Sequence, residues 1–135
     1  MSDSDIKRCI TDLADKMDHK ILVIWAADCA EHVLPYFNEK HPKDKRPQIA
    51  IEAGRAWARG EMSVNDARTA AFEAHAAARD ARESAARAVA RAAGHAAAAA
   101  QVANHAVHGA DSAASAITGE RIWQYKHLLK LSGNS

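Results

Sequence analysis

The sequence has few of the residues that break helices, cross-link chains or fill cores. It contains three prolines, six glycines and two cysteines among 135 residues, and aromatic residues amount to 5% of the chain. The cysteines, Cys9 and Cys29, form no CxxC pair and give no sign of a disulfide framework. A reducing cytosol is therefore the simpler compartment for this chain.

Charge of one sign and long apolar runs are scarce as well. Eighteen basic and seventeen acidic residues leave a net charge of +1, without the basic excess of a duplex-binding protein or the acidic excess of a nucleic-acid mimic. The longest strongly apolar run, residues 21–27, is too short to cross a bilayer, and residues 1–5 are polar and acidic, unlike a secretory signal. We expect a cytoplasmic protein with neither nucleic-acid nor membrane partners.

Alanine is abundant where these other residues are missing. Half of the fifty residues 67–116 are alanine, and only Gly94 and Gly109 interrupt this proline-free segment. Because alanine has the highest helix propensity, the segment is predicted to be helical. An alanine face buries little apolar area, so its helices must approach closely, toward the lower end of the roughly 8–10 Å range of axial separations.

Helical periodicity extends on both sides of the alanine-rich segment. Ser2 or Asp3 can cap a first helix, and Asp18 a second one that is apolar nearly all round and kinks or ends at Pro35. Residues 47–59 form a third predicted helix, with proline at its first position.

Four further signals divide the rest of the chain. Ser63 caps a fourth predicted helix, a break is expected at 80–84, and a fifth helix continues to 108, where Gly109 and Asp111 mark a stop and a restart before a bulky terminal helix. The fold class is thus all-α, a compact bundle of about six helices with a close-packed alanine-rich helix pair. We expect residues 1–131 to form a single helical domain and residues 132–135 a disordered tail.

Two groups of polar side chains are candidates for chemistry. Asp28 and His32 lie four residues apart on the apolar second helix, where they can form an acid–base pair or half of a metal site, or belong to a structural network in which Asp28 bonds a helix end, an indole or an arginine. His105 and His108, with His95 ten residues upstream, can share a divalent metal or simply lie on a polar helix face. No third ligand is determined by local spacing.

Basic side chains form stripes along the fourth and fifth predicted helices. They are candidate partner-binding residues: Arg68, His75, Arg79, Arg82, Arg87 and Arg91. Guanidinium forks suit the carboxylates or phosphates of a partner. The alternative is a solvated flank in which these side chains pair with Glu73, Asp80 and Glu83.

Several motifs occur in an order that resembles a known family. They are WAADCAE at 25–31, VLP at 33–35, RP at 46–47, IEAGRAWARGE at 51–61, AAGHAA at 92–97 and WQ at 123–124. Together they resemble, over roughly residues 21–128, the small prokaryotic proteins grouped as immunity-protein-five-like, or putative immunity proteins. The resemblance implies an all-helical cytoplasmic protein that neutralises a cognate toxin of a bacterial polymorphic or contact-dependent toxin system. It assigns no catalytic residue.

Three hypotheses about function follow. The first is an immunity protein that blocks a toxin by steric capping and complementary charge, using patches such as residues 38–46 and the basic stripes. The second is a metal or small-ligand site where the second and fifth helices meet, made of Asp28, His32, His95, His105 and His108. The third is a self-associating bundle whose alanine faces form a dimer seam. We favour the first, without a cofactor or catalytic residues.

Overall fold

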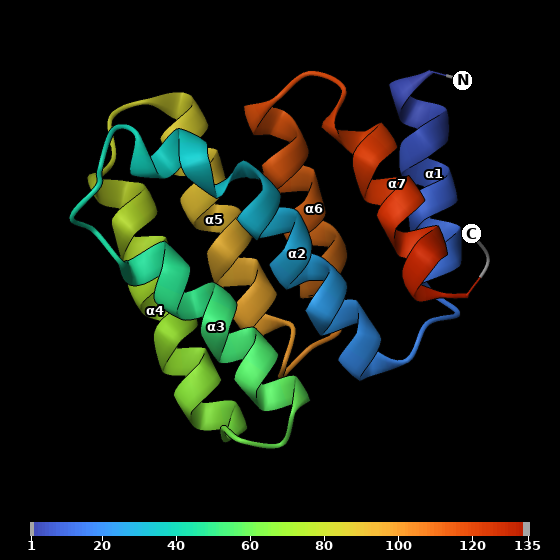
Figure 1. The fold of residues 1–135 in the computed structure, drawn as a ribbon, viewed down its shortest axis with the longest axis horizontal. Coiled ribbons are helices and arrows are strands. Elements are labelled where there is room, and N and C mark those ends of the chain that lie inside the picture. The colour runs from blue at the N-terminus through green and yellow to red at the C-terminus, as the bar shows by residue number, and fades with distance from the viewer. Residues whose placement is uncertain (1, 134–135) are drawn as a thin grey trace.

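Seven α-helices make up residues 2–133, the part of the chain that this computed structural model describes (Figure 1). They are α1 (Asp3–Ala14), α2 (His19–Asn38), α3 (Arg46–Ala58), α4 (Val64–Asp80), α5 (Ser84–Ala98), α6 (His105–Ala116) and α7 (Glu120–Leu131). No strand occurs among these residues. The all-α prediction is confirmed, and the expected break at 80–84 separates α4 from α5.

The predicted number of about six helices is too low, because the helix expected to continue to residue 108 is two helices. The chain turns at 99–104, and Gly109 and Asp111, the expected stop and restart, lie inside α6. A single helix over 84–108 would be about 38 Å long and would extend past its neighbours. Folding α6 back onto α5 buries both alanine faces. The stabilisation from this packing is not part of the intrinsic helix propensity of the residues.

Helix α5 lies at the centre of the bundle, with α2, α3, α4 and α6 packed against it. Its buried residues are almost all small: Ala86, Ala88, Val89, Ala90, Ala92, Ala93, Gly94, Ala96 and Ala97. A Cβ atom at Gly109 would lie 3.2 Å from the carbonyl oxygen of Ala92. Gly109 thus lets the α6 backbone approach α5 and does not end a helix.

Helix α2 supplies the bulk that the alanine helices lack. Trp25 and Phe37 are fully buried, together with Val23 and Val33. The indole Nε1 of Trp25 donates a hydrogen bond of 3.0 Å to the backbone oxygen of Gln124 in α7. This bond satisfies the polar atom of the largest core side chain and ties α2 to the terminal helix.

The first and last helices, α1 and α7, lie side by side at one end of the molecule (Figure 1). Arg121 of α7 donates to Asp3 of α1 at 2.8 Å and to Asp111 of α6 at 2.7 Å. The expected tail, 132–135, extends outside the described residues, so its disorder and the division into domains stay predictions. Within 2–133, every helix is too short or too polar to cross a membrane.

Candidate functional site

The first polar group, the Asp28 cluster, consists of Asp28, Glu31, Arg55 and His127. Helices α2, α3 and α7 bring these side chains together. Asp28 Oδ1 accepts a hydrogen bond from Arg55 Nη2 at 2.8 Å, and its Oδ2 pairs with His127 Nε2, also at 2.8 Å. Asp28 therefore has an arginine partner, one of the structural roles that its sequence position allows.

Arg55 is the hub of this cluster. Its guanidinium donates to both oxygens of Glu31, at 2.8 and 3.0 Å, and reaches Glu52 at 3.3 Å. The hydrogen bonds from Arg55 lower the pKa of the Glu31 carboxyl, and the carboxylates raise the pKa of Arg55 in turn. The hydrogen bonds from Arg55 to Asp28 and Glu31 join α3 to α2.

A stack of rings adjoins the Asp28 cluster. His32 Nδ1 lies 2.6 Å from Oε2 of Glu120, a carboxylate only 5% exposed. The His32 ring stacks on Trp123 with centroids 3.8 Å apart, and His127 also stacks on Trp123, at 4.8 Å. A pocket of about 390 Å³ opens here, lined by Asp28, Glu31, His32, Trp123 and His127.

The pocket has bases but no activated nucleophile among its lining residues. Cys29 follows Asp28 on α2, yet it is fully buried. Burial raises the pKa of its thiol well above the ordinary value, and the charges of Glu120 and Asp28 raise it further. Cys29 is therefore an inert core thiol.

The second polar group, the histidine cluster, contains His75 of α4, His95 of α5, and His105 and His108 of α6. The Nδ1 atoms of His95 and His105 lie 2.9 Å apart, and the centroids of the His75 and His95 rings 5.0 Å apart. Gly94 makes room for this group, because a Cβ atom there would lie 2.7 Å from His75 Nε2.

Burial favours the neutral form of three of these imidazoles, those of His75, His95 and His105. It lowers the pKa of His95 to about 4, helped by the neighbouring rings of His75, His105 and His108 and by Arg91. The pKa values of His75 and His105 are lowered as well, again mainly by burial. The lowered pKa values favour neutral rings, and each neutral imidazole has one nitrogen with a lone pair.

The five residues expected in one ligand cluster are divided between these two groups. Asp28 and His32 point toward α3 and α7, with partners Arg55 and Glu120. The other three, His95, His105 and His108, come together where α5 meets α6. The structure does not bring the two sets together, because Asp28 and His95 contact different neighbours on different helices.

Sequence reasoning missed Arg55, Glu120 and His127 as site residues. His127 reaches Asp28 across 99 positions and Glu120 reaches His32 across 88, so no local spacing indicates either pair. His75 was assigned to the basic stripe, whereas its half-buried ring belongs to the histidine cluster. The only local signal was the (i, i+4) spacing of Trp123 and His127.

The arginines predicted to bind a partner, here named the α4–α5 arginines, are Arg68, Arg79, Arg82, Arg87 and Arg91. All five are exposed, and none forms a salt bridge within the described residues. Two of the carboxylates expected to pair with them bind elsewhere: Asp80 pairs with Arg46 at 3.0 Å, and Glu83 with His41 at 2.8 Å.

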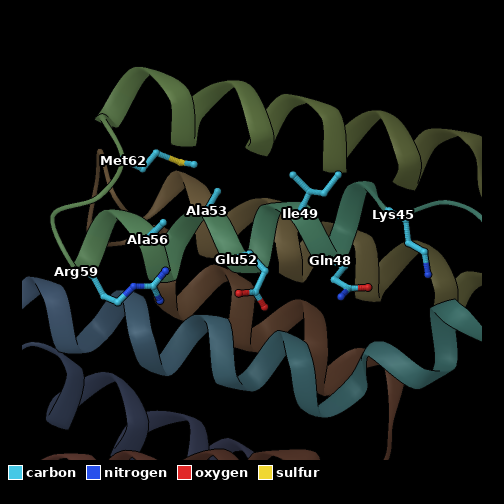
Figure 2. Close-up of a pocket in the computed structure, with 8 residues that line it drawn as sticks. All are labelled: Lys45, Gln48, Ile49, Glu52, Ala53, Ala56, Arg59 and Met62. Carbon is cyan, nitrogen blue, oxygen red and sulfur yellow. The ribbon is translucent and has the colours of Figure 1, made fainter.

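A shallow groove, here named the α3 groove, runs along the outer side of α3 (Figure 2). It has a volume of about 610 Å³ and is lined by Lys45, Gln48, Ile49, Glu52, Ala53, Ala56, Arg59 and Met62. Figure 2 shows Ile49, Ala53 and Ala56 in a row along one side of α3. Ile49 is 57% exposed, so it presents an apolar side chain at the surface of this groove.

Comparison with known protein families gives a match to most of the chain. A family model described as Imm-5 like putative immunity protein matches residues 12–130, which include α2 to α6 completely. No curated protein and no solved structure matches the chain.

Proposed function

The chain belongs to the family described as Imm-5 like putative immunity proteins, and on this premise we propose that it binds and neutralises a cognate prokaryotic toxin by direct protein–protein contact. The observation that carries the proposal is the family match, which extends over nearly the whole bundle. An immunity protein of this kind acts as a rigid surface that covers the toxin, so its binding residues are expected on the outside of the helices.

The α4–α5 arginines are the first proposed contact surface. Within the described residues these five exposed guanidinium groups have no carboxylate partner, so an acidic partner breaks no salt bridge when it binds them. Arginine binds carboxylates in a bidentate geometry, and complementary charge accelerates association. We therefore propose an acidic toxin surface opposite these helices.

The α3 groove is the second proposed contact surface. Its exposed Ile49 and its alanine floor can accept an apolar anchor side chain, while Lys45, Glu52 and Arg59 provide a charged rim. An apolar centre with a polar rim is typical of protein interfaces. Toxin binding through this groove would depend on shape more than on charge.

Co-expression with the toxin encoded beside this gene tests the function. We expect the chain to restore growth of cells that produce the toxin, and the two proteins to elute as a 1:1 complex. Failure of both the growth rescue and the pull-down would refute the proposal.

Charge and shape can be separated with two variants. If the arginines make the contact, the double substitution Arg79→Glu and Arg82→Glu should slow association and weaken toxin binding by at least about tenfold. If the α3 groove makes the contact, Ile49→Glu should weaken toxin binding by a similar factor. Arg8→Glu, an exposed change on α1, is the matched control. Wild-type affinity in both variants would exclude both surfaces.

A further inference from the structure

Half of the histidines of this protein come together in one place. The chain has eight, and four of them form the histidine cluster. His95 lies in the last turn of α5, and His105 and His108 lie in the first turn of α6. The turn at 99–104 thus brings the three rings together from two consecutive helix ends.

The spacing of three of these rings fits coordination of one metal ion. The ligand atoms of His95, His105 and His108 all lie within 4.8 Å of one another. Zinc binds imidazole nitrogen at about 2.0–2.1 Å, which places tetrahedral ligand nitrogens roughly 3.3 Å apart and ring centroids roughly 5 Å apart. The observed centroid separations are 5.1, 5.8 and 5.9 Å, and the Nδ1 atoms of His95 and His105 are 2.9 Å apart. Ring movements of about 1 Å would therefore bring the nitrogen atoms to the separations that the ion requires.

The donor set also selects the type of metal. Within the described residues, the only hydrogen bond made by these ring nitrogens is the one between His95 and His105, and no carboxylate pairs with them. Magnesium and calcium require oxygen ligands, whereas zinc and other late first-row divalent ions accept imidazole. The opposed dipoles of the α5 carboxyl end and the α6 amino end partly cancel at this point.

We propose that His95, His105 and His108 form a Zn²⁺ site that joins the end of α5 to the start of α6. The fourth coordination position is left to a water molecule. His75 stacks edge-on against His95 from α4 and supports its orientation. The ion cross-links the two helices across the turn at 99–104. The start of α6 has no side-chain capping hydrogen bond of its own. This site is independent of toxin binding.

Titration of the full-length chain, without a histidine tag, with Zn²⁺ tests the proposal. We expect one ion per chain by calorimetry and a higher melting temperature. Co²⁺ in place of Zn²⁺ should give the visible absorption of a tetrahedral complex, while Mg²⁺ should have no effect.

Replacement of single ligands locates the ion. His108→Ala changes an exposed side chain, so its fold should persist, and it should weaken Zn²⁺ binding by at least about a hundredfold, as should His105→Ala. His41→Ala removes a histidine outside the cluster and should bind as the wild type does. Absence of stoichiometric binding, or equal affinity in His108→Ala, His105→Ala and the wild type, would overturn the assignment, and neither result bears on immunity.

Discussion

The two polar clusters of this bundle shift the pKa values of their members in opposite senses: toward the charged form for Glu31 and Arg55, and toward the neutral form for His75, His95 and His105. In the Asp28 cluster, Arg55 lies between Asp28 and Glu31, and its hydrogen bonds lower the pKa of the Glu31 carboxyl, which favours the charged form. In the histidine cluster, the charged neighbours are Arg79 and Arg91, and burial lowers the pKa values of His75, His95 and His105, which favours their neutral forms. The first cluster therefore links α2 and α3 through hydrogen bonds between charged side chains. The second holds together imidazole nitrogens that can act as metal ligands.

The largest effect on the free energy of unfolding is expected from removal of Arg55, the central residue of the Asp28 cluster. Arg55→Ala leaves Asp28 and Glu31 close together without their cation, so we expect a loss of about 2 to 3 kcal/mol in the free energy of unfolding. Urea denaturation measures it. Arg59→Ala, which removes an exposed pair with Glu61, should cost less than about 1 kcal/mol. Equal losses of unfolding free energy in the two variants would show that the Asp28 cluster does not stabilise the contact between α2 and α3.

The histidine cluster is expected to have a smaller effect on the free energy of unfolding. Its pH dependence is opposite to that of a salt bridge between histidine and carboxylate. The folded-state pKa of His95 is lowered to about 4 from 6.5, so below pH 6.5 the unfolded chain binds more protons than the folded one. Stability is then complete above pH 6.5 and falls as the pH approaches 4. For this half-buried ring we expect a loss of about 2 kcal/mol, discounted for solvent screening.

Glu31 of the Asp28 cluster and His95 of the histidine cluster should respond in separate pH windows. Because the pKa of Glu31 is lowered from 4.5, its contribution is lost only below that pH. Denaturation of metal-free protein between pH 7 and pH 4.5 therefore isolates the histidines, and His95→Gln should flatten the curve there. A curve unchanged by this substitution would assign the pH dependence to other groups.

The smallest effect concerns the room that glycine makes for the histidine cluster. Gly94→Ala places a Cβ atom against the His75 ring, and we expect a loss of about 1 kcal/mol despite the better helix propensity of alanine. In the background of His75→Ala the same change should be neutral or stabilising by up to about 1 kcal/mol. Thermal melts of the four proteins form a double-mutant cycle, and additive effects would argue against the contact.

Local signals predicted much of this fold but little of the sites. Ser63 does cap α4, with its side chain accepting from the backbone N–H of Asp66, whereas α2 continues past Pro35 to Asn38. The turn at 99–104 was missed because alanine on both sides favours helix, and only packing on α5 opposes it. His95, His105 and His108 were recognised as a group by their short separation, whereas the partners of Asp28 lie far away in the chain.

The sequence alone determined that this chain is helical, where most of its helices begin and end, and which family it belongs to. These properties depend on residues near one another or on motifs in order, and alanine propensity and caps act within a few residues. Only the tertiary structure decided that α6 folds back on α5, that Arg55 and His127 bind Asp28, and that four imidazoles meet beside Gly94. Contacts across tens of residues are chosen by the burial of whole helix faces, and no local pattern encodes that choice.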